Sequence, residues 1–231
     1  MINTVLFDFV NTIAFLNPLK EDILLQYCQK ENNIFLSRKM VEEVYTEIDS
    51  ILPYSSVGIK SSSDKRSFYQ EYNKQLFKRL GIGGFDGFYD FYCSIEKEWA
   101  LDRSVFEVFK FLKDMKITIG LLSNFDSNLE DVLENLKILN MLDFVVVSAK
   151  IGLEKPNIEF YEYAKSIYNI NVDETIYVGD SYELDYIPAS EAGFTSFLID
   201  RNDSMTKKAN RLQSIDKIIE IVNNEREINV T

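Results

Sequence analysis

Five short runs of apolar residues along the 231-residue chain predict buried strands. Each run is almost continuously apolar and rich in β-branched or aromatic residues. This pattern is typical of parallel strands that are covered by helices on both faces. The strands are predicted at residues 4–8, 117–122, 144–148, 175–179 and 195–199.

Helical patterns lie between the last four strands. Ser104, followed three residues later by Glu107, is typical of a capping box that opens a helix to about residue 115. Apolar residues at helical spacing predict further helices at 128–139, 157–168 and about 215–223. Strands that alternate with helices in this way predict a Rossmann-like α/β fold, with a parallel sheet of about five strands flanked by helices.

The segment from residue 15 to residue 98 has a different pattern. It contains no convincing buried strand, and its polar and apolar positions predict helices at 21–31, 37–51 and 65–80. The segment follows the first strand and ends where the alternating pattern resumes. We therefore predict an α/β core domain of residues 1–14 plus 99–231 and an inserted all-helical domain of residues 15–98.

One part of this insert, residues 60–79, is rich in basic side chains: Lys60, Lys65, Arg66, Lys74, Lys78 and Arg79. Two interpretations are open. The segment is a solvated helix face, or it attracts an anion to the insert.

Composition excludes several classes of protein. The net charge of −12 argues against a nucleic-acid partner, which requires a basic face, whereas a small anionic ligand can still bind at a local site. No apolar run approaches the ~20 residues of a membrane span, so no membrane association is expected. The start of the chain lacks the features of a signal peptide, and the two cysteines are expected to be reduced, as in a cytoplasmic protein. Composition predicts no oligomeric state.

The chain contains no histidine. This removes Ser-His and Cys-His nucleophiles and every histidine-ligated metal site. Any catalysis must therefore use carboxylates, lysine, hydroxyl groups or a metal bound by oxygen atoms, for which Mg²⁺ is the natural choice.

Polar residues follow four of the predicted strands at their carboxyl ends. In a parallel sheet these ends line one crevice. Carboxylates, an ammonium and hydroxyls gathered there suit a phosphate beside Mg²⁺, because the metal offsets the repulsion between carboxylates and phosphate. The residues concerned are Asp8, Thr12, Ser123, Asn124, Lys155, Asp180 and Asp185.

Each of these residues also has a plain explanation when it is taken singly. Asp8 suits a helix cap or a turn, Ser123-Asn124 suits an N-cap, and Lys155 suits a surface charge ahead of Pro156. Their order on successive strands favours a shared site instead.

The same stretches resemble the four motifs of the haloacid dehalogenase-like (HAD) hydrolase superfamily, and the resemblance covers essentially the whole chain. The inserted helices resemble the superfamily's C1 cap, which closes over the active site. The stretch Ser123 to Asp126, and Asp185-Tyr186 before Ala192-Gly193, are similar to the branch named for rhythmically expressed gene 2. The four motifs read Asp8-Phe9-Val10-Asn11-Thr12, Leu121-Leu122-Ser123-Asn124, Glu154-Lys155-Pro156 and Val178-Gly179-Asp180-Ser181-Tyr182-Glu183-Leu184-Asp185.

The resemblance implies a Mg²⁺-dependent phosphatase that acts on a small phosphorylated metabolite. Asp8 would be the nucleophile that forms an aspartyl-phosphate, and Lys155 would stabilise the charge of the nucleophile and of the phosphoryl group. The resemblance assigns phosphoryl binding to Thr12, Ser123 and Asn124. It assigns metal binding to Asp8, the backbone carbonyl of Val10 and Asp180, with Asp185 supporting the metal's waters or Lys155.

Val10 departs from the superfamily's pattern, because it stands where the general acid/base is expected. A valine cannot transfer a proton, and such help is worth roughly 10²–10⁴-fold in rate, or about 2.7–5.4 kcal/mol of barrier. We therefore expect an ordinary alkyl phosphate to be hydrolysed slowly. The neighbouring Asn11, which replaces a glycine, tolerates left-handed backbone comparatively well.

Three functions remain open. The first is a phosphatase of low intrinsic activity, or one whose substrate has a good leaving group. The second is a low-turnover module that binds a phospho-ligand or a protein. The third is a metal-independent 2-haloacid dehalogenase. The superfamily's dehalogenases also lack the second aspartate, but they do not keep the fourth motif to which Asp180 and Asp185 belong here.

Overall fold

The computed structural model describes residues 1–55, 57–59, 61–201, 203 and 207–228. The chain forms two compact units, Met1–Phe15 with Trp99–Thr231 and Leu16–Glu98. We call the first the α/β unit and the second the helical unit. That the helical unit acts as a cap domain stays a prediction.

A parallel sheet forms the centre of the α/β unit, so the predicted fold class is confirmed. Its strands run in the order β5-β4-β1-β6-β7-β8. Five of them lie at the predicted places, whereas β8 has only two residues, too few to give a sequence pattern. The strands are β1 (Thr4–Phe7), β4 (Thr118–Ser123), β5 (Phe144–Val147), β6 (Thr175–Gly179), β7 (Thr195–Ile199) and β8 (Arg211–Leu212).

The register of the central strands brings their carboxyl ends together. Phe7 of β1 pairs with Leu121 of β4 on one side and with Val178 of β6 on the other. The residues that follow these three strands therefore emerge at the same edge of the sheet.

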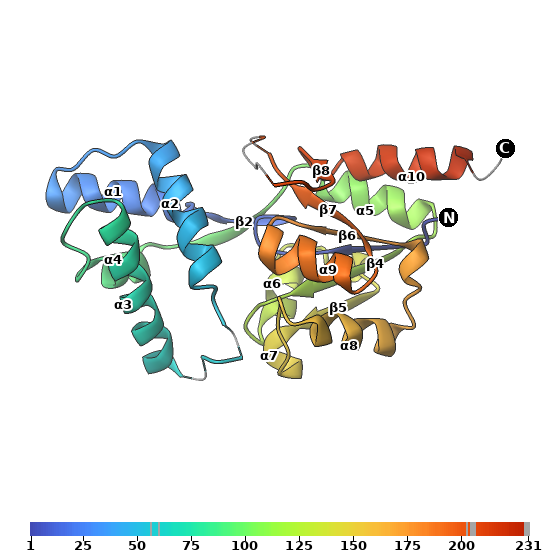
Figure 1. Ribbon diagram of the computed structural model, residues 1–231, viewed down its shortest axis with the longest axis horizontal. Helices are drawn as coiled ribbons and strands as arrows, with labels where there is room; N and C mark the ends of the chain where they lie inside the picture. The colour runs from blue at the N-terminus through green and yellow to red at the C-terminus, as the bar shows by residue number, and fades with distance from the viewer. Residues whose placement is uncertain (56, 60, 202, 204–206, 229–231) are drawn as a thin grey trace. The chain divides into compact units, whose positions relative to one another are not determined.

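Helices cover both faces of this sheet (Figure 1). Val5 and Phe7 of β1 share a core with α5 (Val105–Asp114) and α10 (Lys217–Ile228). Leu6, which points to the opposite face, shares a core with α8 (Ile158–Tyr168) and α9 (Ile187–Glu191). The strands are almost continuously apolar because neither face meets water.

Two helix predictions need correction. The pattern at 128–139 forms α6 (Leu129–Asn135) and then a separate 3-10 turn, η1 (Leu139–Met141), because Lys137 takes a left-handed conformation with φ 62°. Ser104 precedes α5, but the predicted capping box is wrong. The Ser104 hydroxyl instead donates to Asp102 Oδ1 at 3.0 Å.

Shorter helical turns complete the α/β unit. They are α7 (Ser148–Ile151), η2 (Val172–Glu174) and a π-helical turn, η3 (Tyr182–Tyr186). Among the described residues, no helix is both long and apolar enough to cross a bilayer.

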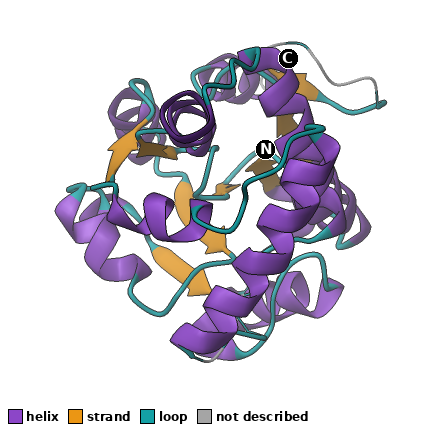
Figure 2. Cartoon of the chain, turned by 90° about the vertical axis from the view of Figure 1, so that its left-hand side faces the viewer, coloured by secondary structure: helices purple, strands orange, loops and turns teal. Residues whose placement is uncertain are grey.

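The described residues of the helical unit form four helices around an apolar core of their own, and Figure 2 shows helices and loops as the main components of this unit. Three helices lie at the predicted places, and α4 was not predicted. The helices are α1 (Lys20–Asn32), α2 (Arg38–Ile51), α3 (Ser62–Arg79) and α4 (Phe88–Ser94). Where the chain passes between the units, β2 (Ala14–Asn17) and β3 (Glu98–Leu101) form an unpredicted two-stranded sheet.

The basic segment 60–79 largely coincides with α3. Lys60 lies outside the described residues. Arg66 pairs with Asp90, and Arg79 pairs with Glu47. Acidic partners are what the solvated-face interpretation expects for these two arginines, whereas the attraction of an anion by the segment stays a prediction.

Candidate active site

Asp8 lies directly after β1, at the edge where the central strands end. Its N–H donates to the Val178 carbonyl at 2.8 Å, which continues the pairing with β6. The residue is only 5% exposed, and both oxygens of its carboxylate have partners. Lys155 Nζ lies 2.6 Å from Oδ1, and the Thr12 hydroxyl donates to Oδ2 at 3.2 Å. The side chain is therefore held in one orientation.

Lys155 is buried, so its interpretation as a surface charge is wrong. Besides Asp8, its Nζ donates to Asp185 Oδ1 at 2.6 Å. Burial alone would lower the pKa of Lys155, but the carboxylates of Asp185 and Asp8 outweigh it and raise that pKa. The lysine is therefore a permanent cation between two acids.

Asn124 fixes the backbone of Lys155. Its amide donates to the Lys155 carbonyl and accepts from the Lys155 N–H, each at 2.8 Å. This pair of hydrogen bonds ties the segment carrying the lysine to the end of β4. The predicted contact of Asn124 with substrate stays a prediction.

Asp185 projects from the π-helical turn η3 and is almost fully buried. It accepts from the Ser181 N–H at 3.1 Å and from the Tyr177 hydroxyl at 2.6 Å. Gly179 makes this approach possible, because a Cβ on it would lie 2.4 Å from Asp185 Cγ. A π-helical turn is itself a feature often found at functional sites.

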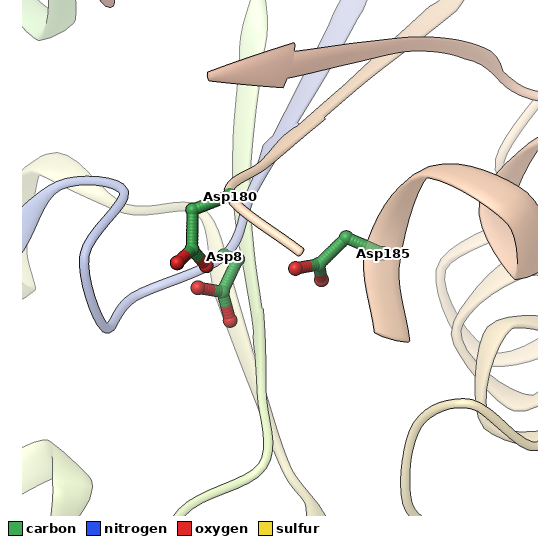
Figure 3. Close-up of side chains that lie close together, drawn as sticks. All are labelled: Asp8, Asp180 and Asp185. Carbon is green, nitrogen blue, oxygen red and sulfur yellow. The ribbon is translucent and has the colours of Figure 1, made fainter. Parts of the chain in front are cut away.

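Three carboxyl groups converge at this edge of the sheet. Oxygen atoms of Asp8, Asp180 and Asp185 lie within 4.8 Å of one another (Figure 3). Burial and the neighbouring carboxylates of Asp8 and Asp185 raise the pKa of Asp180 to about 8. Burial also raises the pKa of Asp8 to about 6, although Lys155 opposes the shift. One lysine therefore does not balance the negative charge of the cluster.

These acids form a donor set that fits a hard divalent cation. All the ligand atoms are oxygens, which Mg²⁺ prefers, and a bound cation would offset the charge that Lys155 leaves uncompensated. The predicted ligands Asp8 and Asp180 and the supporting Asp185 are thus brought together. The predicted role of the Val10 carbonyl as a metal ligand stays a prediction.

Ser123 ends β4 and is buried, yet its hydroxyl makes no hydrogen bond. Within the part of the chain that the structure describes, it is the one buried side-chain polar atom without a partner. Leaving such a group unpaired costs about 1–3 kcal/mol, so each case requires an explanation. A ligand oxygen that accepts from Ser123 would supply one.

The loop after Asp8 carries Val10, which is half-buried against the apolar core of the α/β unit. Asn11 has φ 58°, the left-handed conformation for which asparagine is comparatively well suited. Its side chain also hydrogen-bonds Asp180. The replacement of glycine at this position is therefore accommodated.

Sequence reasoning missed two residues of this region. Tyr177 lies in the middle of β6 and also accepts from Lys155 Nζ at 3.3 Å, and Arg201 binds the loop after Asp8. A tyrosine within an otherwise apolar strand, and a charge just beyond β7, were the available signals.

Comparison with known proteins agrees with these motifs. The family model described as haloacid dehalogenase-like hydrolase matches residues 2–193. Among curated proteins, haloacid dehalogenase-like hydrolase domain-containing protein 3 of Xenopus laevis is 27% identical over 154 residues, 63% of this chain and 62% of the frog protein. The rhythmically expressed gene 2 protein of Drosophila melanogaster is 33% identical over 93 residues, 39% of this chain and 36% of the fly protein.

A third relative is named for its activity. Glyceraldehyde 3-phosphate phosphatase of Methanocaldococcus jannaschii is 30% identical over 87 residues, 36% of this chain and 38% of that protein. The matched segments cover less than two thirds of the length of each of these three relatives.

Solved structures share the fold over nearly the whole chain. A magnesium-bound protein of Bacillus subtilis described as the HAD-hydrolase YfnB has a TM-score of 0.67 at 20% identity, covering 96% of this chain and 99% of that one. L-2-haloacid dehalogenase of Xanthobacter autotrophicus has a TM-score of 0.64 at 13% identity, with 96% and 99% covered. From its motifs, its fold and the match of residues 2–193, this chain is a member of the haloacid dehalogenase-like hydrolase family.

Proposed function

We propose that this hydrolase is a Mg²⁺-dependent phosphatase that acts on a small phosphorylated metabolite. The observation that carries the proposal is the cluster of three acids, of which Lys155 contacts only the two buried ones. A divalent cation would compensate the remaining negative charge, and the bound cation would attract a phosphate. The phosphatase of Methanocaldococcus jannaschii, a partial relative, supports the same activity. In this proposal the enzyme is cytoplasmic, and neither a nucleic acid nor a membrane is its partner.

The chemistry would begin with Asp8. A carboxylate oxygen attacks phosphorus, the bond from phosphorus to the leaving oxygen breaks, and an aspartyl-phosphate forms. Lys155 stays protonated beside Asp8 and offsets the charge of the two reacting groups. Water then attacks phosphorus, the bond from phosphorus to the Asp8 oxygen breaks, and phosphate leaves with the protons of that water, which returns Asp8 to its carboxylate.

Binding of the phosphoryl group would fall to the hydroxyls around Asp8. Ser123 has an unused buried hydroxyl, and Thr12 already contacts the nucleophile at 3.2 Å. Mg²⁺, held by Asp8, Asp180 and the Val10 carbonyl with Asp185 in support, would neutralise phosphoryl charge when bound.

Val10 determines which substrates suit this site. Because its side chain gives no proton, the leaving group departs as an anion or takes a proton from solvent. Aryl and acyl phosphates, whose leaving groups are stable anions, should therefore react much faster than alkyl phosphates.

The first experiment measures phosphate release from an aryl phosphate with Mg²⁺ and with EDTA. We expect turnover that requires the metal and that Asp8→Asn abolishes. Asp131→Asn is the matched control, because Asp131 is exposed on α6. Turnover that persists in EDTA or in Asp8→Asn would contradict the proposal.

The absence of an acid at Val10 and the shared fold with dehalogenases favour a second candidate, 2-haloacid dehalogenase. That reaction would release halide from a 2-haloacid in EDTA. We expect none, because Asp180 places a third acid beside Asp8, where a substrate carboxylate would be repelled. Metal-independent halide release would replace the phosphatase proposal.

Val10, which cannot transfer a proton, also favours the third candidate, a module that binds a phospho-ligand or protein with little turnover. Vanadate or inorganic phosphate binding, without turnover across a panel of phosphate esters, would identify it. Efficient turnover of one ester would exclude it.

A further inference from the structure

An ion pair between Arg201 and Asp102 supports the loop that follows Asp8. Arg201 lies two residues beyond β7, and its guanidinium reaches back to the loop. Nη1 donates to the Asn11 carbonyl at 2.6 Å, and Nη2 donates to the Thr12 carbonyl at 2.9 Å. The guanidinium also lies over the Phe15 ring, 4.6 Å from its centroid. The planar fork of arginine suits such a pair of neighbouring acceptors.

Asp102 holds this arginine in place. Its Oδ2 accepts from Arg201 Nη2 at 3.1 Å, and its Oδ1 accepts from the N–H and hydroxyl of Ser104, each at 3.0 Å. Its own N–H donates to the Ile13 carbonyl at 2.9 Å. Three consecutive carbonyls, at residues 11, 12 and 13, therefore receive donors from Arg201 and Asp102.

These contacts determine the direction of the loop backbone. The loop closes on itself through the Asn11 N–H to Ala14 carbonyl bond at 2.8 Å and the Ile13 N–H to Phe9 carbonyl bond at 3.1 Å. Arg201 adds the outer support and thereby fixes the peptides on both sides of Thr12. The Thr12 hydroxyl is the group that contacts Asp8 Oδ2. The contacts thus run without a break from Asp102 through Arg201 and Thr12 to Asp8.

We propose that Arg201, held by Asp102, is a positioning residue that keeps the loop of residues 10–13 in the conformation that sets Thr12 against Asp8. The proposal rests on the proposed function, because it gives Arg201 a purpose in a reaction at Asp8. Arg201 itself touches no reacting atom. It acts by preorganising the loop, so its loss should lower the rate more than it weakens substrate binding.

The test compares Arg201→Ala, Arg201→Lys and Asp102→Asn with Arg103→Ala. Arg103 is the matched control, because it is exposed and makes no ion pair among the described residues. With an aryl phosphate and Mg²⁺, we expect Arg201→Ala to lower kcat by about 10–100-fold, as loss of an outer support typically does, with little change in KM. Arg201→Lys, which keeps the charge but not the fork, should restore part of kcat, and Asp102→Asn should lower it less.

Two further readouts require no turnover. Hydrogen exchange reports on the amides of residues 9–15. The fluorescence of Trp99, the single tryptophan, reports on the loop because its ring lies 5.0 Å from that of Phe9. We expect faster exchange at 9–15 and altered Trp99 emission in Arg201→Ala, and neither change in Arg103→Ala.

The outcomes separate the two proposals. If the wild-type protein turns over phosphate and Arg201→Ala matches Arg103→Ala in kcat and exchange, the role of Arg201 is overturned and the phosphatase stands. Faster exchange throughout the α/β unit would make Arg201 a general structural residue and would also overturn it. If the wild-type protein turns over no phosphate ester, the proposed function fails. In that case hydrogen exchange at residues 9–15 is the measurement that decides whether Arg201 holds the loop.

Discussion

Val10 stands two residues after Asp8, where the superfamily's proton donor is expected, and its side chain is half-buried. Val10→Asp should raise kcat toward an alkyl phosphate by at least about 10-fold, since a placed general acid is worth roughly 10²–10⁴-fold. It should also lower the free energy of unfolding by about 1 kcal/mol, because part of a valine's burial is lost. Steady-state kinetics and urea unfolding measure the two effects.

Val10→Asn is the matched control for this substitution. Asparagine has nearly the same size and polarity as aspartic acid, but it has no titratable proton. It should show the same loss of stability with no gain in rate. An equal gain in both variants would mean that polarity at position 10, and not proton transfer, limits turnover.

Ser123 gives a second prediction at the scale of one residue, with opposite signs for stability and binding. Because its buried hydroxyl is unpaired, Ser123→Ala should raise the free energy of unfolding by about 1 kcal/mol, the lower end of the cost of an unsatisfied group. The same change should weaken vanadate binding by about 10-fold, since a hydrogen bond to a charged group is worth roughly 1.5–3 kcal/mol. Urea unfolding and a vanadate titration test both.

Ser148→Ala is the comparison for Ser123→Ala. Ser148 is also fully buried, but its hydroxyl accepts from the Phe125 N–H at 3.0 Å. Its removal should destabilise the protein and leave vanadate binding unchanged. If Ser123→Ala destabilises the protein as much as Ser148→Ala does, the Ser123 hydroxyl has a partner in the ligand-free protein.

At the scale of elements, the junction of β6 and η3 depends on a glycine. A Cβ at Gly179 would meet Asp185 Cγ at 2.4 Å, so Gly179→Ala forces Asp185 away from Lys155 and Tyr177. We expect a loss of about 1–3 kcal/mol, typical of overpacking, together with loss of turnover. Thermal unfolding and kinetics measure this. Gly83→Ala should be neutral, because nothing lies within 4 Å of its added carbon. An active, fully stable Gly179→Ala would show that η3 adjusts freely.

The elements that could be predicted are those whose signal is local. The longer strands of the main sheet could be predicted because burial on both faces leaves almost no polar position in them. The strand β8 could not be predicted, because two residues are too few to show a periodic pattern. The early end of α6 depends on the left-handed Lys137, which no apolar pattern marks.

The site was predictable to the extent that the sheet alone creates it. Parallel strands in register bring Asp8, Ser123 and Asp180 to one edge, whatever the loops do. Arg201 could not be assigned from sequence, because its acceptors lie 190 and 189 residues away on a loop whose path the pattern does not specify. Contacts of this kind require the folded loop.

At the scale of the whole molecule, the charge is unevenly compensated. The chain carries a net charge of −12, and many surface acids pair with a lysine or an arginine. Asp180 instead lies beside two further carboxylates, with its pKa raised to about 8 by burial and by those neighbours. Ionising all three carboxyl groups is therefore costly in the folded state, and any cation that binds among them should stabilise that state.

Mg²⁺ should therefore raise the Tm of the protein. At ten times its dissociation constant, a ligand of the folded state alone contributes about 1.4 kcal/mol, which is about 3–6 °C for a chain of this size.

Asp180→Asn should abolish this shift in Tm. It should also raise the Tm in EDTA, because the neutral amide removes the repulsion from Asp8 and Asp185. Asp131→Asn, at an exposed position of α6, should keep the wild-type shift. Thermal scans with Mg²⁺, EDTA and a sodium salt of equal ionic strength separate binding from screening. An equal rise in the sodium salt, or a full shift in Asp180→Asn, would mean that the acidic cluster does not hold the metal.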